Sequence, residues 1–251
     1  MATYTPDCTT SRTLAHLHFL LPLCHSLPVC QNVAKTHPKV AGIVAFADLT
    51  DPNVDVALTH LASLPHVRGI RQLLNYHPAK PEISNPTDIL AHPNFHTNYA
   101  LLAKHKLHFE FHAFHVQLQA GATLAQQHPN IPIVVNHSGL CVEHSEEGID
   151  QWKAGLRALA AHPNVTIKVS GLGMTDNKWT AESVRPFILD TIEIFGVERC
   201  MFASNFPVEK VIGSYTDWYR AFKQIVASKF TAEQQKALFH DNAVRIYRLR
   251  Q

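Results

Sequence analysis

Four times along this chain, a predicted helix is joined to an apolar, β-branched segment by a short turn that contains proline. These joints span residues 36–40, 64–67, 127–131 and 161–165. Parallel strands are connected by helical crossovers of one hand, so repeated joints of one kind favour a single parallel sheet. The pattern predicts six strands, over residues 40–48, 67–73, 107–114, 131–136, 165–170 and 200–204.

Helical segments separate these strands. They are predicted over residues 31–37, 53–63, 95–105, 116–128, 149–162, 181–195 and 215–228, with a last helix that begins at Thr231. A closed (β/α)8 barrel takes eight strands and typically about 250 residues. The 251 residues fit this length, but two strands at the front are missing. We therefore expect an α/β chain folded as a TIM (β/α)8-type barrel that is incomplete at its N-terminal end.

The N-terminal part is the least regular. Residues 1–12 are polar and predict an irregular start, and residues 13–251 predict one barrel-like domain. The apolar run at 14–24 is interrupted by histidine and proline and is too short to span a membrane. Only Arg12 supplies positive charge before it, which argues against a secretory signal. Residues 13–30 are also the segment that could supply the missing strands.

Composition limits the class of protein. A hydrophobic content of 46% and a charged content of 17% are typical of an ordinary globular chain. The net charge of +2 and the lack of a basic stripe give no support for nucleic-acid binding. The five cysteines form no CxxC pair, so we interpret them as free thiols in a reducing compartment and expect a cytoplasmic protein.

The 18 histidines are the unusual feature of the composition. Several stand before proline at predicted helix ends, at His37, His92, His128 and His162. A histidine in a last helical turn suits the helix dipole, and the proline after it stops the helix. Most of the excess is therefore interpreted as structural, and the count alone is no sign of a metal site.

Polar side chains gather at the predicted strand ends. The apolar segment 131–135 runs straight into Asn136-His137-Ser138-Gly139, and functional groups of α/β barrels lie at the carboxyl ends of strands. The same position in other strands holds Asp48, Arg71 with Gln72, His112 with His115, Lys168 with Ser170, and Ser204 with Asn205. A barrel would bring them to one rim, where they suit an oxygen-rich, anionic or lactone-like small molecule.

Each of these residues also has a structural interpretation. His137 could cap its strand by bonding to backbone, and Asp48 could turn the chain or cap the next helix. His112 and His115 are three residues apart, so they cannot share one face of a regular strand, and at least one is expected in a loop or at the surface. A buried Lys168 without a partner would be costly, so a role in the site and a purely structural role both remain open for this residue.

Six stretches together carry a family resemblance. They are residues 47–49 with 67–71, then 94–103, 135–139, 167–172, 200–208 and 242–247. In this order they resemble the amidohydrolase-related (amidohydrolase 2) family of TIM-barrel hydrolases, in its branch of sugar-acid lactonases and 2-pyrone-4,6-dicarboxylate-lactonase-like proteins. The resemblance covers roughly residues 38–250.

The resemblance implies a hydrolase with its site at the barrel rim. The family has an HxH pair after the first strand, a histidine after the sixth, and an aspartate after the eighth that serves as general base and, in metal-dependent members, as a ligand. His137 matches the sixth-strand histidine and Arg71 a substrate-contacting arginine. Asn205 falls where the aspartate belongs. Only His16 and His18 could provide the HxH pair.

Two departures from the family pattern matter. An amide cannot take a proton near pH 7, so Asn205 cannot be the base, although it could orient water or substrate. In a chain this rich in histidine, about one HxH match is expected by chance, and residues 19–39 are too few for the usual first loop, helix and second strand. The resemblance therefore leaves two cofactor states open: one divalent metal (Zn or Mn), held by His137, His16 and His18, or none.

We expect a hydrolase that opens a lactone or related ester by attack of water. In it His137 polarises the carbonyl or binds metal, Asn205 takes part in catalysis, the base is unidentified, and four residues bind substrate: Arg71, Lys168, His112 and Ser170. The partner is a small molecule rather than nucleic acid or membrane, and a homo-oligomer is allowed. Two alternatives stay open: an inactive family member that acts as a binding protein, and a decarboxylase on the same fold.

Overall fold

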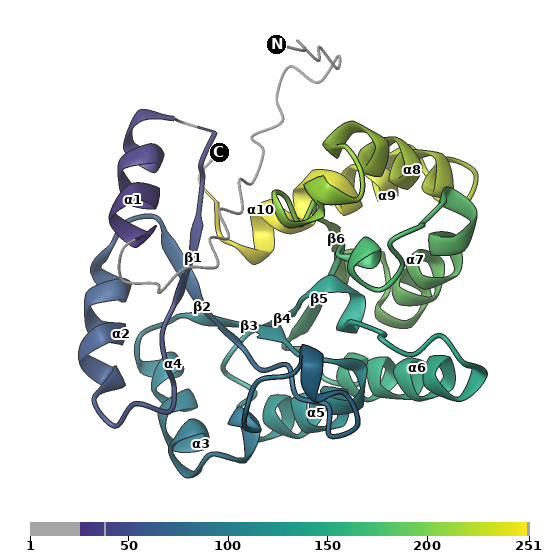
Figure 1. Cartoon of the computed structure of the whole chain (residues 1–251). Helices are drawn as coiled ribbons and strands as arrows, with labels where there is room; N and C mark the ends of the chain where they lie inside the picture. Colours follow the sequence, from purple (N-terminus) through teal and green to yellow (C-terminus); the bar gives the residue numbers. More distant parts are fainter. Residues whose placement is uncertain (1–25, 38, 250–251) are drawn as a thin grey trace.

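The computed structural model describes residues 26–37 and 39–249, which form one parallel sheet curled around an axis (Figure 1). Its strands stand side by side in chain order, and every neighbouring pair is parallel. Each crossover thus moves one strand further in the same direction, which is the topology of a barrel and not of a doubly wound sheet. The α/β, TIM-barrel-type prediction is confirmed, with all six predicted strands: β1 (Ile43–Phe46), β2 (Val67–Leu73), β3 (His108–His112), β4 (Ile133–Val135), β5 (Val165–Val169) and β6 (Cys200–Phe202).

Helices surround the sheet in Figure 1, and α10 lies between the two edge strands in that view. Their bounds are α1 (Ser26–Thr36), α2 (Val54–Ser63), α3 (Pro93–Tyr99), α4 (Leu101–Lys104), α5 (Leu118–Gln127), α6 (Glu146–Ala160), α7 (Ala181–Phe195), α8 (Tyr215–Ala227), α9 (Ala232–Lys236) and α10 (Asn242–Ile246). Two predicted helix boundaries are confirmed. α7 ends before Gly196, whose φ is 77°, and the Thr231 side chain accepts a hydrogen bond from the Gln234 N–H at the start of α9.

Two local predictions were wrong. The helix expected over 95–105 is two short helices, α3 and α4, with Ala100 between them. The first strand spans only Ile43–Phe46, and the first helix already begins at Ser26. His92 does end a helix, the single 3-10 turn Ile89–Ala91, and it also caps the start of α3, because its Nδ1 accepts the Asn94 N–H at 3.2 Å. Pro93 is tolerated because the first helical residue has no intrahelical N–H bond to lose.

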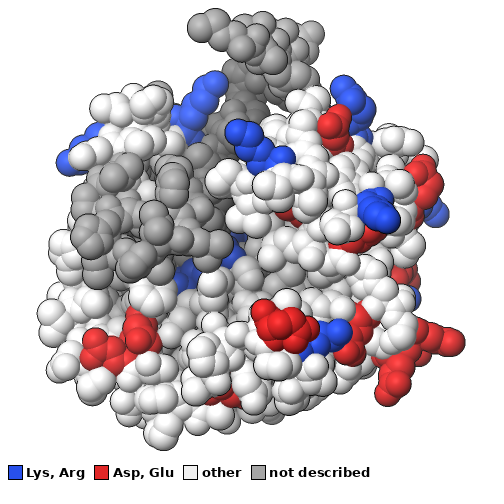
Figure 2. Space-filling model, viewed as in Figure 1, with Lys and Arg blue, Asp and Glu red and all other residues white. Residues whose placement is uncertain are grey.

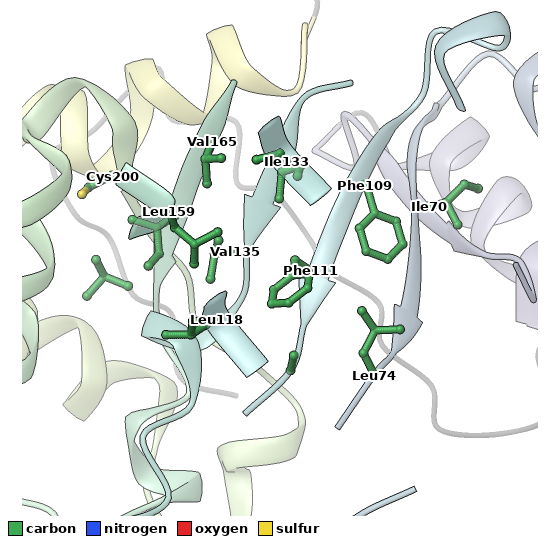
Figure 3. Close-up of a cluster of buried hydrophobic side chains, with 14 of the residues drawn as sticks. Ile70, Leu74, Phe109, Phe111, Leu118, Ile133, Val135, Leu159, Val165 and Cys200 are labelled. Carbon is green, nitrogen blue, oxygen red and sulfur yellow. The ribbon is translucent and has the colours of Figure 1, made fainter. Parts of the chain in front are cut away.

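The main core lies between the sheet and the outer helices. Phe109 and Phe111 on β3 and Ile133 and Val135 on β4 are fully buried there, as Figure 3 shows. Side chains alternate along a strand, so the residues that alternate with the two phenylalanines face the opposite side of the sheet. On β3 these are His108, Glu110 and His112, all buried. The inner side of this strand is therefore polar.

The segment after α10 closes the amino-terminal end of the sheet. Tyr247 and Leu249 form a small cluster with Met201 of β6, and Ala41 and Val44 at β1 pack against it. The Arg248 guanidinium donates to the backbone carbonyls of Arg68, at the start of β2, and Lys106, just before β3. This segment thus bridges from the last described strand to the first three.

Several predictions fall on residues that the structure does not describe. The irregular start at 1–12, the missing strands of 13–25 and the pair His16 and His18 lie outside the described residues. Within residues 26–37 and 39–249, no helix combines the length and apolar character needed to cross a membrane. On the face drawn in Figure 2, acidic and basic side chains are interspersed and form no continuous basic surface.

Candidate functional site

His137 stands in a strained turn at the carboxyl end of β4. Its φ is 54°, and the following Ser138 and Leu140 also have positive φ, of 51° and 41°. Left-handed backbone is unfavourable for residues other than glycine and concentrates at functional sites. The turn is held by Trp152 of α6, whose Nε1 donates to the Ser138 carbonyl at 2.6 Å. The fold therefore maintains an unfavourable backbone conformation to place this histidine.

The segment after β5 fixes the orientation of the His137 ring. Nδ1 of His137 lies 2.9 Å from Oγ of Ser170. Gly171 follows with a φ of 68°, and a Cβ at this position would lie 2.5 Å from Cγ of His137. Glycine is needed here for both its backbone conformation and the space it leaves.

Arg71 of β2 contacts two imidazoles. Its Nη2 lies 3.3 Å from Nε2 of His137 and also contacts Nδ1 of His112, whose ring is nearly perpendicular to that of His137 at 5.0 Å between centroids. A guanidinium can only donate, so both of these ring nitrogens accept. A neutral His137 then carries its proton on Nδ1 and donates it to Ser170.

Glu110 balances two cations beneath this cluster. Its Oε1 accepts hydrogen bonds from Lys168 Nζ and from the Tyr247 hydroxyl, each at 2.6 Å, and Nη1 of Arg71 lies 3.9 Å from Oε2. Lys168 Nζ also donates to Oδ1 of Asn136 at 3.3 Å. Glu110 is fully buried, so the cations around it are required to offset its desolvation.

The charges of this network follow from burial and pairing. Burial lowers the pKa of Lys168 to about 8 and that of Arg71 to about 10, while the Glu110 carboxylate works against both decreases. Both side chains stay mainly protonated at pH 7. Burial, together with Glu110, raises the pKa of Tyr247, so its hydroxyl remains a donor. We conclude that Arg71 presents a full positive charge to the two imidazoles.

Asn205 lies at the carboxyl end of β6 in left-handed backbone, with a φ of 51°. Its Nδ2 is 3.0 Å from Sδ of Met174, in the turn after β5. Asp48 has the structural role anticipated for it, because its Oδ1 accepts from the Thr50 N–H and from Gln72 Nε2, each at 2.9 Å. It therefore shapes the turn after β1.

Most predicted site residues come together. Arg71, His112, His137 and Ser170 form one contact cluster, and Lys168 joins it through Glu110. His115 lies in the turn after β3, as expected for one of the two histidines, but it is buried rather than at the surface. The sequence reasoning missed Glu110 and Tyr247. The alternation His108-Phe109-Glu110-Phe111-His112 could have revealed the first, whereas nothing local marks the second.

Comparison with known proteins identifies the family of this chain. A sequence model of the amidohydrolase family matches residues 16–249. The chain belongs to the amidohydrolase family. Within the family it is 38% identical over 221 residues to the uncharacterized protein y4mH of Sinorhizobium fredii, an alignment that covers 87% of this chain and 73% of the relative.

Other relatives lie in the lactonase-like branch of the family. An L-fucono-1,5-lactonase of Burkholderia ambifaria is 28% identical over 228 residues, covering 87% of this chain and 74% of the relative. A crystal structure of an amidohydrolase from Burkholderia multivorans with bound Zn has a TM-score of 0.77 at 22% identity, covering 89% of this chain and 78% of that one. This last similarity supports the barrel fold.

The described residues can be tested against the zinc that this neighbour binds. A metal ion would need the lone pairs of His137 Nε2 and His112 Nδ1, and both of these nitrogens face the Arg71 guanidinium. Over residues 26–37 and 39–249, no three His, Cys, Asp or Glu side chains are arranged to hold a metal ion. The described residues alone therefore do not fit a metal, and His16 and His18 lie outside them.

Proposed function

We propose that this amidohydrolase opens a lactone, or a related ester, by attack of water at the carboxyl-end rim of the barrel. The observation that carries the proposal is the cluster of Arg71, His112, His137 and Ser170, contributed by four adjacent strands or the turns that follow them. It combines a full cation with imidazoles of defined tautomer. The similarity to a protein named L-fucono-1,5-lactonase supports a sugar lactone as substrate.

Arg71 and His137 supply complementary chemistry in this proposal. Hydrolysis of a lactone places negative charge on the carbonyl oxygen, which the Arg71 guanidinium stabilises by donating to it. A carbonyl oxygen bound to Arg71 replaces the contact between Nη2 and the His137 imidazole, which frees Nε2 to accept a proton from the attacking water. Nε2 then returns this proton to the ring oxygen as the acyl C–O bond of the lactone breaks. Ser170 keeps the ring in the tautomer that this step needs.

The remaining predicted residues have supporting roles. Lys168 is already bonded to Glu110 and Asn136, so we assign it to positioning: it helps neutralise the carboxylate that faces Arg71. His112 contacts the same Nη2 of Arg71 through its Nδ1 and so helps to hold the guanidinium in place. Asn205 has a polar amide at the end of β6 and serves to orient substrate or water, because it cannot act as the base.

A lactone panel tests the proposal. Purified protein is offered L-fucono-1,5-lactone, other sugar lactones and 2-pyrone-4,6-dicarboxylate, with and without Zn2+ or Mn2+, and ring opening is followed by proton release. We expect hydrolysis of at least one sugar lactone, and a loss of at least about 100-fold in kcat/KM in His137→Gln. His60→Gln, at an exposed position of α2, is the matched control and keeps full activity.

Two results would contradict the proposal. One is that every lactone stays intact under all metal conditions, which favours an inactive binding protein. The other is release of CO2 from a carboxylated substrate without ring opening, which favours a decarboxylase. Equal activity of His137→Gln and His60→Gln would remove His137 from the mechanism while leaving the reaction class in place.

A further inference from the structure

A second polar cluster gathers three loops at the carboxyl end of the sheet. His77 lies in the loop after β2, His115 in the turn after β3, and Glu143 in the loop after β4. Nε2 of His77 is 3.5 Å from Oε1 of Glu143, and Nε2 of His115 is 3.7 Å from Oε2. Nζ of Lys80 lies 3.8 Å from Oε1. Three nitrogen groups thus converge on one carboxylate.

Backbone contacts define which nitrogen of each imidazole carries the proton. The Ala79 N–H donates to Nδ1 of His77 at 3.2 Å, and the Val142 N–H donates to Nδ1 of His115 at 3.4 Å. Each Nδ1 is therefore an acceptor, and the proton of the neutral ring is on Nε2. Both imidazoles present an N–H group toward Glu143. This arrangement suits an anion, whereas a metal ion would need lone pairs at these two nitrogens.

These two N–H groups are buried, and their contacts with Glu143 are longer than well-formed hydrogen bonds. The side chains of His77 and His115 are 7% and 0% exposed, and neither Nε2 has a hydrogen-bond partner in the structure. The Glu143 oxygens stand beyond the usual N–H···O range of up to about 3.2 Å. A buried donor without an acceptor is unfavourable, so an oxygen that approached more closely would be stabilised here.

Glu143 is able to leave this position. Its side chain is 34% exposed, whereas the two imidazoles are enclosed. Its backbone is fixed, because Gly148 packs so tightly on it that a Cβ there would lie 2.4 Å from the Glu143 carbonyl oxygen. Exchange of the carboxylate for another anion therefore requires only a rotation of the Glu143 side chain.

We propose that His77, His115 and Lys80 form a binding subsite for a small oxyanion, a carboxylate or a phosphate group, and that the Glu143 carboxylate fills this subsite when no ligand is bound. Two N–H donors and an ammonium match the acceptor oxygens and the negative charge of such a group. Glu143 then acts as an internal competitor that weakens anion binding. The inference concerns binding alone and holds whether or not the chain hydrolyses lactones.

Isothermal titration with inorganic phosphate and, separately, with succinate tests this subsite in the full chain in Tris buffer. Glu143→Ala is expected to bind at least one probe tenfold or more tighter than the wild type. Adding His77→Ala or Lys80→Ala to that variant should abolish the gain. The preferred probe then tells whether the subsite favours a phosphate or a carboxylate group.

Two further variants keep the test decisive. Glu143→Gln removes the charge but retains the shape, so it should show the same gain if Glu143→Ala folds poorly. Glu147→Ala removes an exposed carboxylate in the first turn of α6 and should bind like the wild type. The proposal is overturned if neither Glu143 variant binds tighter than the wild type, if Glu147→Ala gains equally, or if the gain survives loss of both His77 and Lys80.

Discussion

The Tyr247 hydroxyl donates a 2.6 Å hydrogen bond to Glu110 across a sequence separation of 137 residues. Lys168 bonds to the same carboxylate oxygen, and Arg71 faces the other one. The network therefore connects the segment that closes the amino-terminal end of the sheet with the guanidinium that contacts His137. Its members can be tested one at a time.

Tyr247→Phe should destabilise the fold by about 1.5–3 kcal/mol, the usual contribution of a hydrogen bond to a charged group. The loss leaves Glu110 with less compensation inside a fully buried site. Urea unfolding followed by circular dichroism measures the change. Tyr215→Phe is the matched control, because the Tyr215 side chain hydrogen-bonds the neutral Tyr219 and not a buried carboxylate, and a smaller change of about 0.5–1.5 kcal/mol is expected there. Equal effects of the two variants would contradict this role of Tyr247.

Lys168→Met should cost about 3–5 kcal/mol, because it leaves the buried Glu110 carboxylate without its nearest cation. The double variant Glu110→Gln with Lys168→Met removes both charges and should recover most of this loss. The coupling free energy from a double-mutant cycle is the measurement. Additive effects of the two substitutions would show that the ion pair is not a unit.

Gly171→Ala and Gly196→Ala form a matched pair for the placement of His137. Both glycines have positive φ, Gly171 in the left-handed region (φ 68°, ψ 15°) and Gly196 in a region that is nearly restricted to glycine (φ 77°, ψ 152°), so both alanines carry about 1–3 kcal/mol of backbone strain. A Cβ at Gly196 meets nothing within 4 Å, whereas a Cβ at Gly171 collides with the His137 ring. Both variants should therefore be less stable than the wild type, but only Gly171→Ala should lose the proposed lactonase activity. Unfolding curves and initial rates of both variants decide the point.

Glu209, in the turn after β6, gives the stability of the fold a characteristic pH dependence. Burial raises its pKa from 4.5 to about 7, although the backbone N–H groups of Gly173 and Met174 oppose the increase. Between these two pH values the folded state holds a proton that the unfolded state has released, so stability falls as pH rises from 4.5 to 7. This increase in the pKa of Glu209 corresponds to about 3 kcal/mol of unfolding free energy.

Glu209→Gln should lack this contribution. The difference in unfolding free energy between wild type and variant, measured from pH 4.5 to 8, is expected to change by up to about 3 kcal/mol and then level off above pH 7. Glu182→Gln, at an exposed position in the first turn of α7, is the control for the substitution itself. A flat profile for Glu209→Gln would show that Glu209 is ionised normally.

Arg71→Lys tests whether the planar guanidinium is needed at the rim. A lysine keeps the charge, but its single ammonium cannot contact the two imidazoles, as Nη2 does, and also face Glu110, as Nη1 does. If the chain hydrolyses lactones as proposed, kcat/KM should fall by about 10- to 100-fold in Arg71→Lys and by about 1,000-fold in Arg71→Met. Arg157→Lys, exposed on α6, is the control and should be unchanged. Full activity of Arg71→Lys would mean that charge alone is sufficient.

The order of the strands was predictable because each helix–strand joint can be recognised from a few consecutive residues. Proline-containing turns and β-branched runs depend on neighbours in sequence, and all six strands formed where those signals lie. The convergence of Arg71 and His137 followed from the parallel sheet. The break at Ala100 was not anticipated, since the same residues are compatible with a continuous helix.

The polar interior was harder to predict from the sequence. Lys168 could be recognised as an inward residue, but its partner Glu110 lies 58 residues away on a strand that reads mainly as aromatic. The meeting of His77, His115 and Glu143 depends on three loops whose paths no local pattern determines. Pairings of this kind arise from tertiary structure and need coordinates.

The bridge made by the segment after α10 has a consequence for the newly made polypeptide. Tyr247 is added only after all six strands have left the peptidyl-transferase centre, so a nascent chain that already possesses the whole described sheet still lacks the phenol that Glu110 requires. The interior of the sheet cannot reach its final polar pairing strand by strand during translation. The hydrogen bond between Tyr247 and Glu110 can therefore form only late in synthesis.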